Sequence, residues 1–265
     1  MPEFKVTRYR IRTTEEQPGP QAPFSAVLLA DLHNHSYGES NSHLLQEIRN
    51  VNPEMVFVAG DMLISTKEPQ FDAAVSLMNE LTRQYPVYYV NGNHESRLKE
   101  YPDKFPDQYE NYISTICSFG VHFLENSMEH FIIRRMPVNV WGLELPLDYY
   151  RRFGKEELTV SQIETWLGKP DMPGYQILLA HHPCWFDTYA SWGADLTLSG
   201  HLHGGMIRLP LLGGVVSPQL TLFPKYDRGL FTKGKSRMVV SAGLGSHSIP
   251  IRVNNPPELV VLDFC

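Results

Sequence analysis

Five short hydrophobic runs divide the chain at intervals and predict buried strands. The runs cover residues 26–30, 55–59, 87–90, 177–179 and 194–198. Each is mostly apolar, and a polar residue or glycine follows within two positions of its end. Runs of this length and composition are typical of strands that are covered on both faces.

Helical spacing of apolar residues appears between several of these runs. In residues 42–51, Leu44, Leu45 and Ile48 fall on one side of a predicted helix, which Pro53 ends. Similar spacing predicts helices over residues 71–83 and 159–167 and within residues 101–119. Further strands are predicted over residues 5–12, 121–124, 131–133, 138–143, 235–243 and 259–264.

Strands and helices alternate in the first half of the chain, and the second half adds β structure. This order predicts an α/β fold, a two-sheet β-sandwich of mixed strands flanked by α-helices. The sequence contains no linker, repeat or low-complexity segment, so we predict one domain over residues 1–265.

Residue types that ligate metals follow each of the five buried runs. They are Asp31 with His33, Asp61, Asn93 with His94, His181, and His201 with His203. Because ligands bind at the carboxyl ends of strands in open α/β sheets, we expect these side chains to meet in one place. They would supply enough ligands for two metal ions.

Taken one at a time, these motifs have ordinary explanations. Asp61 could be a helix N-cap, and Asn91-Gly92 favours a hairpin turn. At an extended strand end, residues two apart point the same way, which pairs Asp31 with His33 and His201 with His203. By the same alternation, we expect His181 to face the site and His182 to pack beside it. Five such motifs in one chain favour the metal site.

Composition narrows the choice of partners. The formal net charge is −6, from 29 acidic and 23 basic residues, which argues against a nucleic-acid backbone as partner. A small anion remains compatible, because bound cations dominate the charge of their own site. The three cysteines, Cys117, Cys184 and Cys265, form no Cys-x-x-Cys pair, so neither thiolate zinc nor a disulfide framework is expected.

The same features suggest where the protein works. The first residues lack the apolar segment of a secretory signal, and no stretch approaches the ~20 apolar residues that span a bilayer. We therefore expect a cytoplasmic protein. The apolar segment 206–223 directly follows His203, and it is either a loop packed on the core or a flap for a lipid-linked substrate that makes peripheral membrane contact.

The motif set resembles the calcineurin-like metallophosphoesterases. It reads Asp-x-His, Gly-Asp, Gly-Asn-His-Glu, a strand-borne His before Pro183, and Gly-His-x-His-Gly-Gly. Weaker likenesses at residues 225–230, 241–245 and 257–259 resemble the bacterial branch that contains phosphodiesterases and UDP-sugar-lipid or nucleotide pyrophosphohydrolases. The resemblance implies a four-layer αββα fold.

The resemblance also implies site roles. One divalent ion (Mn, Fe or Zn) would be held by Asp31, His33, Asp61 and His203, and a second by Asp61, Asn93, His181 and His201. Asp61 would bridge the two ions. His94 would not ligate; it would act on the leaving-group oxygen, as an imidazolium acid, or hold the phosphoryl oxygens.

The implied activity is hydrolysis of a phosphodiester or pyrophosphate bond by water that the two ions activate. The substrate would be a small phosphorylated molecule: a nucleotide, a nucleotide-sugar or a lipid-linked phosphate. The chain departs from the family at Ile64, where an acidic residue often stands three positions after the bridging aspartate. The alternatives are a catalytically silent scaffold of the same fold that binds proteins, and a histidine-rich protein that stores metal or holds structural zinc.

Overall fold

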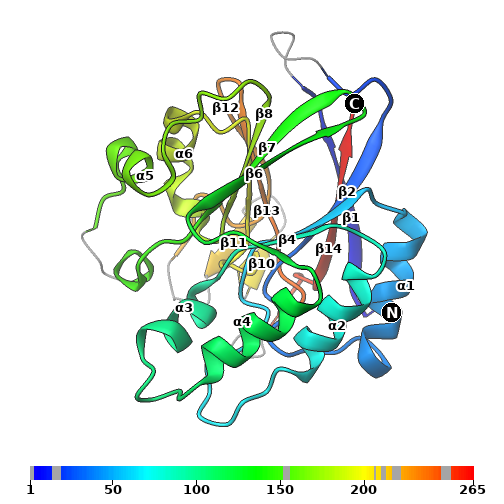
Figure 1. Cartoon of the computed structure of the whole chain (residues 1–265), viewed down its shortest axis with the longest axis vertical. Helices are drawn as coiled ribbons and strands as arrows, with labels where there is room; N and C mark the ends of the chain where they lie inside the picture. The colour runs from blue at the N-terminus through cyan, green and yellow to red at the C-terminus, as the bar shows by residue number, and fades with distance from the viewer. Residues whose placement is uncertain are drawn as a thin grey trace.

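Two six-stranded mixed sheets pack face to face, with helices on the outer side of each (Figure 1). The prediction of a two-sheet α/β sandwich flanked by helices is confirmed. The computed structural model describes residues 3–13, 19–151, 156–205, 207–209, 213–216, 222–245 and 252–265.

The first sheet has the strand order β1-β14-β2-β3-β4-β5. Strands β2, β3, β4 and β5 are parallel to one another, and β14 is antiparallel to β2 and parallel to β1. The strands are β1 (Lys5–Ile11), β14 (Glu258–Phe264), β2 (Phe24–Leu29), β3 (Met55–Val58), β4 (Val87–Tyr89) and β5 (His122–Phe123).

The second sheet has the order β12-β13-β9-β8-β7-β6, in which the four central strands are parallel and both edge strands antiparallel. The strands are β12 (Gly229–Lys233), β13 (Ser236–Val240), β9 (Leu196–Ser199), β8 (Tyr175–Ala180), β7 (Met136–Leu143) and β6 (Ser127–Ile133). Parallel order at the centre of both sheets explains why four of the five runs lack apolar–polar alternation: both of their faces are buried.

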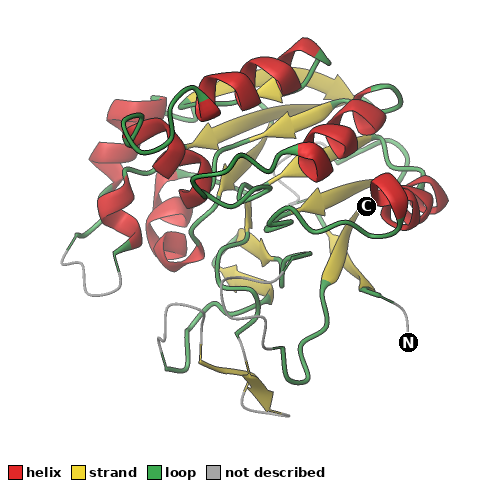
Figure 2. Cartoon of the chain, turned by 90° about the horizontal axis from the view of Figure 1, so that it is seen from below, coloured by secondary structure: helices red, strands yellow, loops and turns green. Residues whose placement is uncertain are grey.

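The helices cover the two outer faces, so the layers run helix, sheet, sheet, helix (Figure 2). The first sheet is covered by α1 (Ser42–Val51), α2 (Asp72–Thr82), α3 (Asn93–Glu100) and α4 (Gln108–Ser118). The second is covered by α5 (Val160–Leu167) and α6 (Phe186–Trp192). Short 3-10 turns are Glu39–Asn41, Leu147–Tyr150 and Pro183–Trp185.

A fully apolar layer joins the two sheets. Leu28 and Phe57 of the first sheet meet Ile177, Leu198 and Val239 of the second, and all five side chains have no more than 1% exposure. This layer fixes how the sheets face each other. It therefore also fixes the distance between strand ends that belong to different sheets.

Helix α1 has the predicted bounds, and α5 begins one residue after the predicted start, with Thr159 as its N-cap. Two helices were missed. Helix α3 begins at Asn93, where the sequence alternative was a hairpin turn, and α6 follows directly after the His181-His182-Pro183 motif. Both are too short for a helical period to stand out from the sequence.

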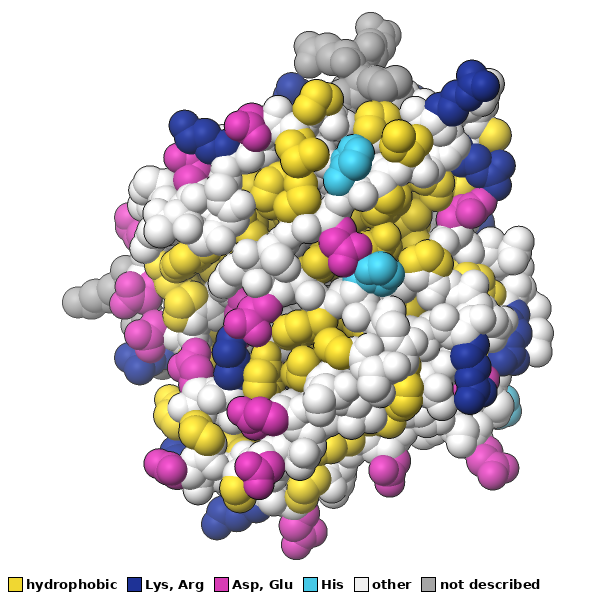
Figure 3. All heavy atoms as spheres, viewed as in Figure 1, with side chains coloured by type: hydrophobic (Ala, Val, Ile, Leu, Met, Phe, Trp, Pro, Cys, Tyr) yellow, Lys and Arg dark blue, Asp and Glu magenta, His cyan; other side chains and the backbone are white. Residues whose placement is uncertain are grey.

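A small antiparallel hairpin, β10 (Ile207–Leu209) and β11 (Gly213–Val216), stands apart from the two sheets. It belongs to the apolar segment 206–223, of which residues 206, 210–212 and 217–221 lie outside the described part. No helix in the described part of the chain is both long and apolar enough to cross a bilayer. On the face drawn in Figure 3, the described Lys and Arg side chains are interspersed with Asp and Glu.

Candidate metal centre

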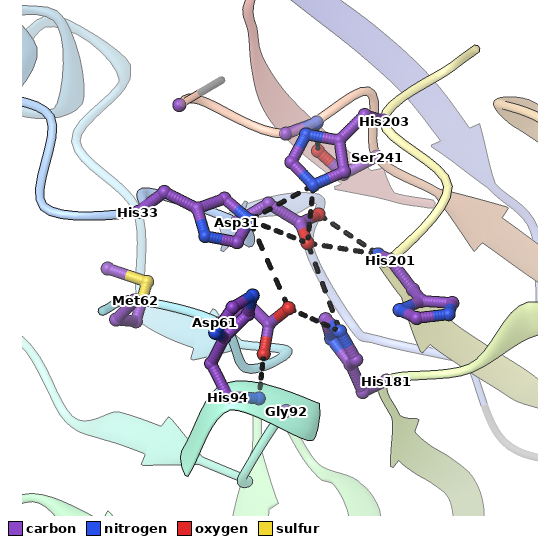
Figure 4. A network of polar contacts seen from close by, with 12 residues as sticks. Asp31, His33, Asp61, Met62, Gly92, His94, His181, His201, His203 and Ser241 are labelled. Atoms are coloured by element: carbon purple, nitrogen blue, oxygen red, sulfur yellow. Dashed lines mark hydrogen bonds and ion pairs between the residues drawn. The ribbon is translucent and has the colours of Figure 1, made fainter. Parts of the chain in front are cut away.

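The carboxyl ends of the five predicted strands meet, and their polar side chains point toward one another (Figure 4). Strands β2 and β3 of the first sheet lead into Asp31, His33 and Asp61. Strands β8 and β9 of the second lead into the histidines. The seven residues proposed as metal ligands are at most 6% exposed: Asp31, His33, Asp61, Asn93, His181, His201 and His203.

One group of three ligand atoms gathers around Asp31. The Nε2 atoms of His33 and His203 lie 3.0 Å apart, and His203 Nε2 lies 3.4 Å from Asp31 Oδ1. His33 Nε2 is also 3.9 Å from Asp31 Oδ1 and 3.9 Å from Asp61 Oδ2. His33 therefore lies between the two carboxylates.

A second group gathers around Asp61 and contains His181 and His201. His181 Nε2 lies 3.2 Å from Asp61 Oδ2 and 3.9 Å from Asp31 Oδ1. Asn93 starts α3 between Gly92 and His94, both of which contact Asp61. Its buried side-chain oxygen has no hydrogen-bond partner among the described residues.

These separations and ligand types fit bound cations. Atoms that share one ion at about 2.0–2.2 Å are themselves about 3–4 Å apart. The distances of 3.0 to 3.9 Å between the carboxylate and imidazole atoms lie in that range. Mixed nitrogen and oxygen ligands suit Mn²⁺, Fe or Zn²⁺, and the buried amide oxygen of Asn93 is satisfied by a cation as well.

The backbone that aims the ligands is not the extended strand end predicted from the i, i+2 spacing. Five of the seven residues have positive φ: Asp31 (52°), His33 (49°), Asp61 (53°), His201 (74°) and His203 (50°). The left-handed conformation costs energy for a residue with a side chain and concentrates at functional sites. Each chain turns sharply as its strand ends, and the alternation argument was therefore wrong in its geometry.

Two close backbone approaches make room for Asp61. A Cβ built on Gly92 would lie 2.3 Å from Asp61 Oδ1, and one on Gly60 would lie 2.4 Å from the backbone nitrogen of Gly92. Gly60 also has φ +84°, a conformation that glycine adopts without strain. The Gly-Asp and Gly-Asn motifs thus allow the loops after β3 and β4 to touch.

Glu95 ties these two loops together, and its role was not predicted. Its buried carboxylate accepts hydrogen bonds from the backbone N–H groups of Asp61, Met62 and Gly92, each at 2.9 Å, and from the Tyr89 hydroxyl at 3.0 Å. The signal in the sequence was its place directly after His94. A hydrogen-bonding role of this kind needs the structure, because the partners lie 34 residues away.

The histidine side of the site is fixed by carbonyl groups. His181 Nδ1 donates to the carbonyl oxygen of Ala59 at 2.5 Å, which leaves Nε2 as the ring nitrogen that faces Asp61. The backbone N–H of His201 donates to both carboxylate oxygens of Asp31, at 3.1 and 3.0 Å. Ligands from the two sheets thus contact each other directly.

A C-terminal segment holds the loop that carries His203. Asn255 Nδ2 donates to the carbonyl oxygens of His203 (2.5 Å) and Gly205 (2.7 Å). Arg252 donates to the carbonyl of Ala242 at 2.9 Å, and its Nη2 lies 3.4 Å from His203 Nδ1. Neither residue was predicted, since no motif surrounds them.

Burial and mutual repulsion set the charges of the chain itself. Burial raises the pKa of Asp31 to about 7, although the neighbouring His181 opposes this shift. Burial also raises the pKa of Asp61, but the charge of His181, which lies against this carboxylate, outweighs burial and holds the pKa well below its usual value. Two buried carboxylates this close compete for positive charge, which divalent cations would supply to both.

His94 contacts the carboxylate proposed to bridge. Its backbone N–H donates to Asp61 Oδ1 at 2.8 Å. Its Nδ1 accepts a hydrogen bond from the Ser65 N–H at 3.0 Å, so Nε2 is the nitrogen that can face a substrate. The ring lies 5.1 Å from the His33 ring. Ile64, at the position where the family often has an acid, makes no polar contact with the ring.

His182 lies beside the site, as predicted. Its ring centroid is 4.5 Å from that of His201 and 5.1 Å from that of Tyr150. Burial, with a contribution from the charge of His181, lowers the pKa of His182 to about 3, so the ring is neutral. The groups of potential ligands found in the described part of the chain do not include it.

Comparison with known proteins identifies relatives. A metallophosphoesterase of Helicobacter pylori strain J99 is 29% identical over 242 residues, which are 89% of this chain and 58% of that protein. The phosphodiesterase YaeI of Escherichia coli K12 is 24% identical over 266 residues, 98% of this chain and 88% of that protein. The chain therefore spans little more than half the length of the Helicobacter relative.

A solved structure, the NAD nucleotidase of Haemophilus influenzae, aligns with a TM-score of 0.48 at 13% identity over 84% of this chain and 51% of that one. The model of the calcineurin-like phosphoesterase family matches residues 24–205, a span that includes all seven proposed ligands and His94. The chain belongs to the calcineurin-like phosphoesterase family.

Proposed function

We propose that this protein is a dinuclear metal-dependent hydrolase of phosphodiester or pyrophosphate bonds. Family membership supports a metal-dependent phosphoesterase. Three overlapping groups of buried potential ligands gather around Asp31 and Asp61, and the third joins His94 to His33 and Asp61. Two of these groups, one around each carboxylate, support the step to two metal sites. In this proposal Asp61 is shared, because it lies between His33 on one side and His181 on the other.

Each ligand has a defined part in the proposal. Asp31, His33, Asp61 and His203 hold one cation, and Asp61, Asn93, His181 and His201 hold the other. When bound, divalent ions of this kind polarise the phosphoryl group and lower the pKa of a coordinated water to about 7. Two carboxylates against two divalent charges leave a net positive site, which favours a phosphate anion.

The residues around the ligands provide order. Glu95 and Asn255 keep the loops in position before any cation binds, and the carbonyl of Ala59 fixes which nitrogen of His181 is available. His94 presents Nε2 beside the shared carboxylate, where a hydrogen bond to a phosphoryl or leaving-group oxygen can form. No covalent bond between protein and substrate is needed.

The proposed substrate is a small phosphorylated molecule such as a nucleotide, a nucleotide-sugar or a lipid-linked phosphate. Two relatives bear names that fit a phosphoesterase, and one is named a phosphodiesterase. The formal charge of −6 supports a small anion drawn by local cations over a nucleic-acid chain. Manganese, iron or zinc would serve, and we propose that the protein works in the cytoplasm.

Metal analysis and a substrate panel test the proposal together. The purified protein, reconstituted with Mn²⁺, is expected to hold two ions per chain and to hydrolyse bis(4-nitrophenyl) phosphate faster than 4-nitrophenyl phosphate. A UDP-sugar diphosphate should also be cleaved. One ion per chain, or two ions with no hydrolysis of any of these compounds, would contradict the proposed function.

A further inference from the structure

Ser65 makes the contacts that decide how His94 can act. The backbone N–H of Ser65 lies 3.0 Å from His94 Nδ1, and Ser65 Oγ lies 3.0 Å from the same nitrogen. Arg97 Nη1 donates to Ser65 Oγ at 3.1 Å. All three residues are at least partly buried beside the candidate metal centre.

The direction of one of these bonds is fixed by chemistry. A backbone N–H can only donate, so His94 Nδ1 must offer its lone pair to Ser65. The neutral ring then carries its proton on Nε2. The Arg97 guanidinium has no acceptor, so Ser65 Oγ accepts from it and can turn its own hydrogen toward Nδ1.

This arrangement differs from one in which a carboxylate accepts a hydrogen bond from the N–H group at Nδ1. A carboxylate partner would favour the doubly protonated ring, which can hand a proton to a departing oxygen. Here two donors face Nδ1, and Ile64 stands where an acidic side chain could have done so. The protonated ring would place two N–H groups against each other.

We propose that Ser65 is a positioning residue that makes His94 a hydrogen-bond donor through Nε2 and not a proton donor, and that the site therefore selects substrates whose leaving group departs without a proton. Diphosphates and aryl phosphodiesters meet this condition, whereas alkyl phosphodiesters do not. The inference rests on the proposed function and names the substrate class for it.

The chemical balance explains the selection. The oxygen of water forms a bond to phosphorus, and the bond between phosphorus and the leaving oxygen breaks, with the electron pair going to that oxygen. A departing phosphate or phenolate spreads this charge over its own atoms, and the proton of the attacking water passes to solvent. A departing alkoxide would need a proton in the same step, and the neutral His94 ring could give up its only proton, on Nε2, only by becoming an anion.

Leaving-group dependence in the Mn²⁺-loaded protein tests this assignment. Across aryl methyl phosphodiesters of graded phenol acidity, kcat is expected to fall steeply as the phenol becomes less acidic. The His94→Ala variant should lower every kcat by about 10²–10³ without changing the steepness, because a donor to the transition state is lost. A shallow dependence in wild type that becomes steep in His94→Ala would overturn the proposal, since it would reveal proton transfer.

Conservative variants distinguish hydrogen-bond donation by His94 from proton transfer by His94. The amide of His94→Gln can donate a hydrogen bond but cannot transfer a proton, so this variant should recover at least tenfold of the activity lost in His94→Ala. Ser65→Pro removes the N–H and should lower kcat at least tenfold with KM and metal content unchanged. Ser65→Ala keeps the N–H and should lose less, and exposed Ser114→Ala is the matched control.

Nitrogen NMR gives a readout that does not depend on turnover. In the zinc-loaded protein with ¹⁵N-labelled histidine, the His94 signals, assigned by their loss in His94→Gln, should show the proton on Nε2. A proton on Nδ1 would overturn the proposal even if Ser65→Pro does not fold. Absence of turnover on every phosphate compound would instead remove the proposed function and, with it, this inference.

Discussion

The two sheets give the site different chemistry and hold it in different ways. The first sheet supplies both carboxylates and the amide, and its loops are fixed by hydrogen-bond donors that converge on Glu95. The second sheet supplies three imidazoles. The Ala59 carbonyl accepts a hydrogen bond from the His181 ring, and Asn255 donates to the carbonyl groups of His203 and Gly205 and so holds the loop of His203.

The difference follows from charge. Carboxylates that are pushed together repel one another, so their loops must be held by contacts that do not depend on a cation. Imidazoles that bind a cation are neutral and do not repel one another, but each has two nitrogens, and a bond to one of them decides which lone pair is offered. The contacts on the carboxylate side therefore set distance, and those on the histidine side set the orientation of the ligands.

Loss of the shared carboxylate should have the largest effect on activity and metal content, because Asp61 contacts ligands from both sheets. Asp61→Asn is expected to lower kcat/KM by more than about 10³-fold, since both ions lose a charged ligand. Metal content measured by mass spectrometry should fall below one ion per chain. The exposed Asp72→Asn variant should match wild type; full two-ion occupancy in Asp61→Asn would contradict the shared role.

The next largest effect concerns pH. Burial raises the pKa of Asp31 to about 7 in the metal-free chain, and a cation must displace that proton. Metal affinity should therefore rise up to about tenfold per pH unit between about 5 and 7. Calorimetric titration with Mn²⁺ across this range measures it.

The free energy of unfolding of the metal-free protein should fall with rising pH, whereas metal affinity should rise. Because the folded pKa of Asp31 exceeds its usual value of 3.8, the fold retains a proton that the unfolded chain releases. The stabilisation is complete below about pH 4 and is lost as pH rises through about 7. Denaturant titrations of metal-free wild type and Asp31→Asn at several pH values measure the free energy of unfolding; the difference between the two isolates Asp31, and a rise of wild type relative to the variant across this window would contradict the shift.

A smaller effect on metal affinity is expected from substitution of Glu95, which holds the loops after β3 and β4 together. Glu95→Gln offers one acceptor oxygen and turns an NH₂ group toward backbone donors, so the loops after β3 and β4 should separate. Metal affinity should fall about 10–100-fold, and the free energy of unfolding by about 1–3 kcal/mol. The exposed Glu110→Gln is the control, and unchanged affinity with lowered stability would confine Glu95 to a structural role.

The sequence predicted the strands and the ligand residues of the two sheets better than it predicted the contacts that hold those ligands in place. The strands were visible because parallel central strands are apolar on both faces, and the ligands were visible because they stand at strand ends. Glu95, Ser65 and Asn255 could not be found in the same way, since each has at least one partner 29 or more residues distant. The positive φ angles of Asp31 and His203 were missed because their turns depend on contacts between loops.

The smallest expected effect concerns the brace of the second sheet. Asn255 supports the loop of His203 through two carbonyl groups but contacts no carboxylate of the site. Asn255→Ala should weaken binding of one ion by about tenfold, the low end for a residue that orients a ligand, and leave the second ion bound. Stepwise Mn²⁺ titration followed by electron paramagnetic resonance separates the two events, with exposed Asn50→Ala as control. Equal weakening of both ions would contradict a role confined to the loop of His203, because His203 is proposed to bind only one of them.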